Sequence, residues 1–166
     1  MSNASSKPSF TIRPAAPGDE KAILGLIREL AEYEHALDEV EATEADLQRD
    51  LFGENPKVHA DVVELEGAVV GTAIWFLNYS TWQGKHGLYL EDLYIRPQHR
   101  GLGMGKAMLQ YLAAKCVKLG YGRFQWWVLN WNEPSIEFYK AHGAVAMDEW
   151  TVYRVSGAEL DKLADS

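Results

Sequence analysis

The chain of 166 residues contains a single cysteine, Cys116, so it forms neither an internal disulfide nor a cysteine-based zinc site. A lone cysteine is typical of the reducing cytoplasm. No apolar run reaches the roughly 18 residues that a membrane-spanning helix needs. Residues 1–9 lack the basic start and apolar core of a signal peptide, and we interpret them as a disordered leader or a cloning artefact. Histidines at metal-ligand spacing are also missing, so we expect no metal. The lack of a long apolar run likewise leads us to expect no membrane partner.

The composition, with 47% hydrophobic and 24% charged residues, is that of a globular protein, and we expect one domain over residues 10–166. The net charge of -8 argues against nucleic acid as a partner. Residues 29–46 hold eight carboxylates and no Lys or Arg, whereas residues 93–132 hold six bases and no carboxylate. A solvated helix face would explain the acidic block by itself. Together the two blocks favour an anionic ligand beside a cationic one.

The hydrophobic periodicity predicts a mixed α/β (α+β) chain in the order βα(α)βββαβαββ, not a regular alternation of βα units. We expect strands over residues 10–14, 59–65, 69–77, 88–95, 124–129, 144–147 and 151–155. We expect helices from residue 20 to a frayed end near 33–35, and over residues 43–51, 104–119 and 134–142.

A glycine-rich turn, Arg100-Gly101-Leu102-Gly103-Met104-Gly105-Lys106, follows a predicted strand and opens a predicted helix. The free N–H groups and positive dipole of a helix N-terminus attract anions, and glycines let a pyrophosphate approach the backbone. The dinucleotide fingerprint G-x-G-x-x-G fails because Lys106 stands at its last glycine. The P-loop pattern G-x-x-x-x-G-K-[ST] could be aligned on Gly105-Lys106. It fails because Arg100 stands in place of its first glycine and Ala107 in place of its Ser or Thr.

With Gln98 two residues before Arg100, the turn resembles the pyrophosphate-binding motif Q/R-x-x-G-x-G/A of the GCN5-related N-acetyltransferases (GNAT). Residues 27–34, 88–93 and 131–139 resemble the spermidine/spermine (diamine) acetyltransferases and their thialysine-acetylating relatives. This likeness extends from Phe10 to about Leu163. It implies the GNAT acyl-CoA N-acyltransferase fold, a central mixed twisted sheet flanked by helices. It also implies direct acetyl transfer from acetyl-CoA, in a ternary complex, to a primary amine of a polyamine, a diamine or a lysine-like amino acid.

The resemblance assigns two catalytic residues. Glu91 would deprotonate or anchor the amine, directly or through a water, because an alkylamine is an ammonium at pH 7. Tyr139, a phenol protonated at neutral pH, would give a proton to the CoA sulfur. Strand alternation predicts that Glu91 and Asp92 lie on opposite faces.

The resemblance also assigns the binding residues. Those expected to contact acetyl-CoA are Leu93, Tyr94, Ile95, Arg100, Gly101, Leu102, Gly103, Met104, Gly105, Lys106, Trp127, Asn132 and Ser135. Those expected to contact the acceptor are Tyr33, Glu34, Trp82, Glu91 and Asp92. Helix capping would also explain Asn132 and Ser135, and an acceptor contact by Asp148 or Glu149 stays open.

The likeness further implies a homodimer. Two other functions stay open from the residues alone: a non-catalytic acyl-CoA-binding module, and acetylation of a protein or peptide amine. The acidic block suits a small polycation better than a variable peptide.

Overall fold

The computed structural model describes residues 9–165 of the chain. Contacts divide the chain into two compact units, one ending at Trp127 and one beginning at Val128, and each is described by itself. The helices of the first unit are α1 (Glu20–Tyr33), the 3-10 turn η1 (Leu37–Glu39), α2 (Glu44–Phe52), the 3-10 turn η2 (Pro97–His99) and α3 (Met104–Leu119). Its strands are β1 (Phe10–Pro14), β2 (His59–Leu65), β3 (Ala68–Ser80), β4 (Lys85–Ile95) and β5 (Phe124–Trp126). The second unit contains α4 (Glu133–Ala141) and α5 (Ala158–Ala164).

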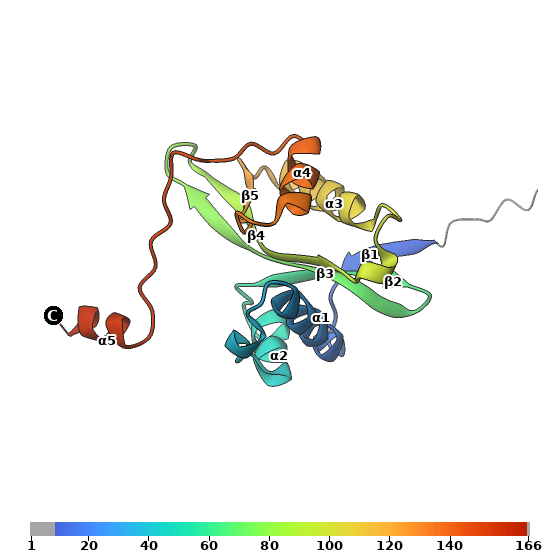
Figure 1. Ribbon diagram of the computed structural model, residues 1–166, viewed down its shortest axis with the longest axis horizontal. Coiled ribbons are helices and arrows are strands. Elements are labelled where there is room, and N and C mark those ends of the chain that lie inside the picture. Colours follow the sequence, from blue (N-terminus) through green and yellow to red (C-terminus); the bar gives the residue numbers. More distant parts are fainter. Residues whose placement is uncertain (1–8, 166) are drawn as a thin grey trace, which may run out of the picture. The chain divides into compact units, whose positions relative to one another are not determined.

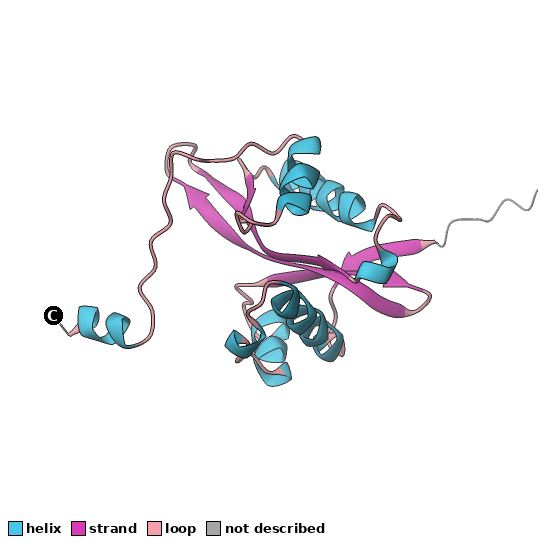
Figure 2. Ribbon diagram, in the orientation of Figure 1, coloured by secondary structure: helices cyan, strands magenta, loops and turns pink. Residues whose placement is uncertain are grey.

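The first unit is a five-stranded sheet in the order β1-β2-β3-β4-β5, with helices on both faces (Figures 1 and 2). Strands β1 to β4 are antiparallel to one another in succession, and β5 runs parallel to β4. Helices α1 and α2 cover one face and α3 covers the other (Figure 1). The predicted mixed sheet flanked by helices is confirmed.

Each face of the sheet buries its own apolar layer. On the α1–α2 face, Ile23 and Leu51 pack with Val62 and Ile74 of the central strands. Helix α3 turns a buried row to the opposite face: Met104, Met108, Leu109, Leu112 and Cys116. The thiol of Cys116 is buried, and burial raises its pKa. Packing on both faces makes the sheet a rigid support for side chains at its ends.

Helix starts show how the local sequence is used. Thr43 and Asp46 form a full capping box at the start of α2. Asp19 stands at the start of α1, but its side chain makes no capping bond to the helix. Its carboxylate instead binds the Arg13 guanidinium at 2.7 Å and accepts a hydrogen bond from the Ala16 N–H. This ion pair fixes α1 to the end of β1.

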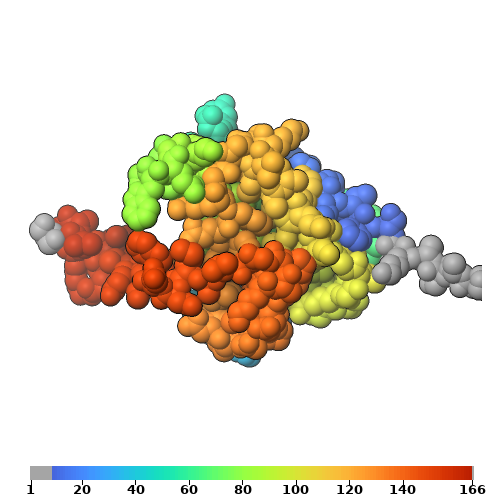
Figure 3. All heavy atoms as spheres, turned by 90° about the horizontal axis from the view of Figure 1, so that it is seen from above, coloured from blue at the N-terminus to red at the C-terminus, as the bar shows by residue number. Residues whose placement is uncertain are grey.

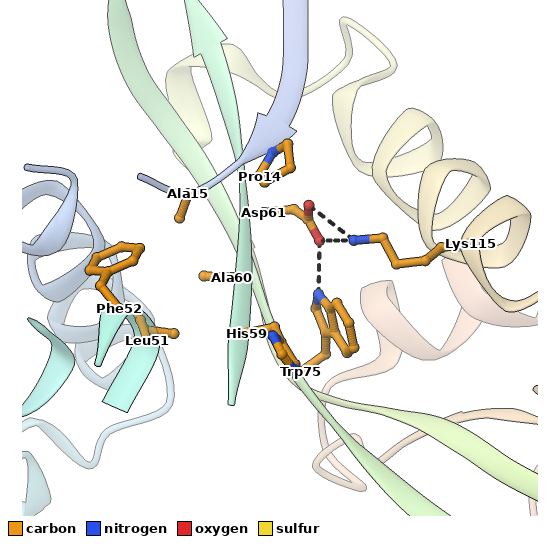
Figure 4. A pocket seen from close by; sticks show the side chains of 9 residues that line it. All are labelled: Pro14, Ala15, Leu51, Phe52, His59, Ala60, Asp61, Trp75 and Lys115. Atoms are coloured by element: carbon orange, nitrogen blue, oxygen red, sulfur yellow. Dashed lines mark hydrogen bonds and ion pairs between the residues drawn. The ribbon is translucent and has the colours of Figure 1, made fainter. Parts of the chain in front are cut away.

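Helix α3 is joined to the sheet by a buried ion pair (Figure 4). Asp61 of β2 is only 1% exposed, and its Oδ2 accepts hydrogen bonds from Trp75 Nε1 at 2.8 Å and Lys115 Nζ at 2.9 Å. The Lys115 ammonium also lies 4.6 Å from the centre of the Trp75 ring, close enough for a cation–π interaction. His59 stacks on the same ring at 4.4 Å, beside a cavity of about 150 Å³. The network therefore ties β2, β3 and α3 together.

The C-terminal third differs from expectation. Strand β5 ends at Trp126 instead of residue 129. The predicted strands over residues 144–147 and 151–155 are wrong: up to residue 165 neither run pairs with another strand, and only a turn bond from Trp150 N–H to Met147 carbonyl joins them. Two short β-prone runs are marginal as an isolated hairpin, so propensity alone does not make them strands. Helix α5 is not predicted from the sequence.

The part of the chain that the structure describes contains no helix long and apolar enough to cross a membrane. Residues 1–8, most of the predicted leader, lie outside the described residues.

We expect Asp61→Ala to lower the free energy of unfolding by about 2–4 kcal/mol, because it leaves the largely buried Lys115 ammonium without its counter-charge. Urea denaturation followed by circular dichroism measures the loss. Asp50→Ala is the control, since Asp50 forms an exposed pair with Arg49 and should change stability far less. Equal losses in the two variants would contradict a special role for the buried pair.

Candidate functional site

The glycine turn has the geometry of an anion cradle. Gly101 and Gly103 have φ of 79° and 84°, the left-handed region that favours glycine, and a Cβ at either position would point into open space. Gly103 is the N-cap of α3 and supplies no side chain to cap it. The first turn of this 16-residue helix carries no acidic residue. The turn (yellow in Figure 3) lies on the surface.

These residues fit a pyrophosphate. The first intrahelical bond runs from Ala107 N–H to the Gly103 carbonyl, so the three preceding amides, at residues 104–106, have no partner within the helix. Arg100 and Lys106 are both exposed at the turn and bring positive charge to it. Met104 is 1% exposed and fixes the start of α3 in the core. Backbone donors, dipole and side-chain charge thus converge on one place.

Strand β4 loses one of its partners beside the turn. It pairs with β5 only from Leu88 to Leu90, whereas its pairing with β3 continues to Ile95. Within the described residues, the β5 side of residues 91–95 therefore has no strand partner. The resemblance predicts that the backbones of Leu93, Tyr94 and Ile95 contact the cofactor along this edge, and that contact stays a prediction.

Strand β4 contains a bulge at the place where the sequence predicts regular alternation of Glu91 and Asp92. Leu90 and Asp92 pair with the consecutive residues Trp75 and Ile74, which leaves Glu91 as the extra residue. Asp92 therefore shares the sheet face of Ile74, which packs against α1 and α2. Glu91 is exposed next to it. The bulge puts Leu90 and Asp92 on opposite faces of the sheet, whereas a strict two-residue period predicts one face for both.

Two neighbouring carboxylates act on Asp92 at this place. Burial chiefly, then the charges of Glu91 and Glu34, raises the pKa of Asp92 to about 6. Burial also raises the pKa of Glu34, which follows the last residue of α1. A cation bound among them would favour the ionised forms and lower both pKa values. The acidic block contributes to this site through Glu34.

The end of α1 contacts the glycine turn through aromatic rings. The Arg100 guanidinium carbon lies 5.7 Å from the centre of the Tyr33 ring and 5.6 Å from that of Tyr94. Glu29, one helical turn before Tyr33, forms an ion pair with Arg96 at 3.0 Å and is hydrogen-bonded to Tyr94. Sequence reasoning missed these contacts, because 67 residues separate Glu29 from Arg96. The signal in the sequence was the opposite charge of the acidic block, residues 29–46, and the basic block, residues 93–132.

Two predicted aromatic residues lie elsewhere. Trp82 is 92% exposed in the turn between β3 and β4. The 11 residues of β4, at about 3.3 Å each, separate this turn from the end of the strand where Tyr94 lies. The structure therefore does not bring Trp82 together with Tyr33. Trp127 is about half exposed and meets the Tyr89 ring edge-on, with 5.8 Å between ring centres.

The remaining predicted residues belong to the second unit. Asn132 is the N-cap of α4, and its Oδ1 accepts a hydrogen bond from the Ser135 N–H at 3.4 Å. The capping role is confirmed, and contact with CoA stays a prediction. Tyr139 lies in the same helix, 5.5 Å from the Phe138 ring. Its role as general acid also stays a prediction.

The family model of the GNAT acetyltransferases matches residues 24–144 of this chain. The chain therefore belongs to the GNAT family, whose members use acetyl-CoA, and it is an N-acetyltransferase.

The thialysine N-epsilon-acetyltransferase of Bos taurus is 39% identical, over 92% of this chain and 96% of its own length. The spermidine/spermine N(1)-acetyltransferase-like protein 1 of Homo sapiens is 37% identical over 93% of this chain, which covers 24% of that longer protein. Among solved structures, an integron cassette protein of V. cholerae superposes with a TM-score of 0.80 at 26% identity, covering 95% of this chain and 99% of that one.

We expect Asp92→Asn to stabilise the ligand-free protein at pH 7.5 by about 1–3 kcal/mol. The pKa of Asp92 is about 6 in the folded protein, above its usual value of 3.8. Its ionisation therefore costs stability increasingly as the pH rises from about 4 to 6, and the full cost remains at higher pH. The gain should therefore shrink at pH 4.5. Thermal unfolding at the two pH values measures it, with Glu39→Gln, an exposed carboxylate of the acidic block, as control. Destabilisation by Asp92→Asn at both pH values would contradict the strained carboxylate.

Proposed function

We propose that this protein acetylates a primary amine of a small cationic acceptor, a polyamine or diamine or a lysine-like amino acid of the thialysine type. The observation that carries the proposal is that the carboxylates of Glu91, on β4, and Glu34, at the end of α1, act on Asp92 of β4, shortly before the chain reaches the glycine turn. A group of carboxylates that includes the partly buried Asp92 favours a cationic ligand, and the neighbouring turn favours an anionic one. An amine acetyltransferase using CoA needs both.

Acetyl-CoA, when bound, supplies the activated acetyl group. In our proposal the amides at residues 104–106, with Arg100 and Lys106, hold its pyrophosphate. The unpaired edge of β4 at residues 93–95 offers backbone groups to the pantetheine and acetyl parts. Trp127, Asn132 and Ser135 complete the expected cofactor contacts.

Proton transfer in the proposal uses one base and one acid. The acceptor arrives as an ammonium with a pKa of about 10 and docks against Asp92 and Glu34, with Tyr33 beside them. Glu91 takes one proton from the nitrogen, directly or through a water, so that its lone pair can attack. The Tyr139 hydroxyl gives one proton to the departing sulfur. The new C–N bond replaces the C–S bond. The nitrogen then gives up its second proton, which restores the one that Tyr139 lost, and no cysteine nucleophile is required.

The named relatives support a cationic acceptor. Besides the thialysine and spermidine/spermine-like proteins, the L-ornithine N5-acetyltransferase of Arabidopsis thaliana is 39% identical over 57% of this chain. Each of these names denotes a small amine that is cationic at neutral pH. Both acceptor types, polyamine and lysine-like amino acid, belong to the proposal. A homodimer, expected from the resemblance, also belongs to it and is tested by multi-angle light scattering.

The test is a CoA-release assay with putrescine, spermidine, lysine and thialysine, supplemented by peptide amines. We expect turnover with at least one small cation and little with the peptides. Turnover with peptides alone would favour a protein acetyltransferase. CoA binding with no turnover on any amine would favour a non-catalytic acyl-CoA-binding module.

We expect Tyr139→Phe to lower kcat by about 10²-fold while CoA affinity, measured by calorimetry, stays unchanged, since only the proton donor is removed. Tyr153→Phe, which alters an exposed tyrosine of the second unit, should leave kcat unchanged. An unaltered kcat in Tyr139→Phe would refute its assignment as the acid.

A further inference from the structure

The two halves of helix α1 are held in different ways. Its fully buried side chains, Ile23, Leu24 and Leu26, all lie in the first half. The second half, residues 27–33, contains no fully buried side chain, and Ile27 packs only partly against the core. Core packing therefore fixes the start of the helix more firmly than its end, and the end depends on polar contacts for its position.

An ion pair joins this second half to the end of β4. Arg96 Nε donates to both oxygens of the Glu29 carboxylate, at 3.0 and 3.2 Å, and its Nη2 lies 3.0 Å from Oε1. Strand β3 orients the arginine, because its N–H donates to the Val70 carbonyl at 3.0 Å and its Nη1 to the Val69 carbonyl at 3.4 Å. The two charged side chains are only 30% and 35% exposed. The pair is therefore a directed connection between α1 and the sheet.

This connection lies between the two parts of the proposed site. Glu34, which acts on Asp92, follows α1 five residues after Glu29. Arg96 directly follows residues 93–95, the strand edge that the proposal gives to the acetyl and pantetheine groups. A shift of the end of α1 would therefore move an acceptor carboxylate relative to the bound acetyl group. Misplacement of reactants by about 1 Å can cost about 10²-fold in rate.

We propose that Glu29 and Arg96 are positioning residues for the acceptor: their ion pair holds the end of α1 on β4 and thereby sets the place of Glu34. This inference rests on the proposed function and deepens it. Neither residue touches the reacting atoms. The cofactor side keeps its own supports without the pair, since β4 remains bonded to β3 up to Ile95 and the Ile95 carbonyl still accepts a bond from Arg100 Nε. Loss of the pair therefore affects the acceptor and spares CoA.

The experiment breaks the pair from either side. Glu29→Gln and Arg96→Gln should each lower kcat/KM for the acceptor, thialysine and in a parallel series spermidine, by about ten-fold. The dissociation constant of CoA, measured by calorimetry at 150 mM salt, should stay within about two-fold, because salt screens the lost charge. The two changes alter the net charge in opposite directions. A purely electrostatic effect on a cationic acceptor would therefore have opposite signs in the two variants, whereas positioning predicts a loss in both.

Two further variants separate positioning from stability. The double variant Glu29→Gln/Arg96→Gln should lose no more activity than the weaker single variant, because either change alone already breaks the pair. Asp19→Asn is the matched control: it breaks the 2.7 Å ion pair with Arg13 at the opposite end of the same helix, about 20 Å from Tyr33. It should lower the thermal unfolding temperature and leave kcat/KM unchanged.

An unchanged kcat/KM in both single variants, effects of opposite sign, or losses that add in the double variant would each overturn the inference. So would a parallel loss of CoA affinity, or an equal loss of kcat/KM in Asp19→Asn. All these results leave the proposed function standing, since they require that the unaltered protein acetylates the acceptor. Absence of turnover by the unaltered protein with every amine of the panel would instead overturn the proposed function itself.

Discussion

Strand β4 keeps its partner β3 to Ile95 but loses β5 after Leu90, and the site depends on this difference. The antiparallel ladder keeps the strand rigid, while the free edge offers backbone groups that a continuous sheet would have consumed. The bulge at Glu91 falls where the parallel pairing stops. It brings Glu91 and Asp92 together beside the end of α1, just before the strand reaches the glycine turn. One interrupted strand thus joins an acidic group to an anion cradle.

In both charge blocks, the structure separates the charged residues that hold elements together from those that remain available to a ligand. In the basic block, Lys115 is neutralised by buried Asp61 and Arg96 by Glu29, so both serve to hold elements together. Arg100 and Lys106 remain at the turn and are the two side-chain charges of the block that fit a pyrophosphate. In the acidic block, Glu29 is likewise committed to Arg96, whereas Glu34 faces Asp92. The site therefore uses fewer charges than the formal count of either block.

The placement of Asp92 suits a cationic ligand but lowers the stability of the ligand-free protein. Burial, together with the charges of two other carboxylates, raises the pKa of Asp92 to about 6. A fold selected for stability alone would place an apolar residue there. Such unfavourable placement is common where a ligand of opposite charge completes the site. The buried pair of Asp61 and Lys115 shows the contrast, since there the counter-charge is built into the protein.

The sequence by itself determined the helices and strands up to Trp126, the glycine turn and the family, because periodicity, capping residues and the motif are local properties. It could not determine the bulge at Glu91, since a bulge depends on the register of the neighbouring strand. It also overpredicted strands after residue 143, where β-prone residues lack a pairing partner. The contacts of Arg100 with Tyr33 and of Asp61 with Lys115 were decided only by the tertiary structure. Each joins residues more than 50 positions apart, and chain folding alone brings such residues within reach.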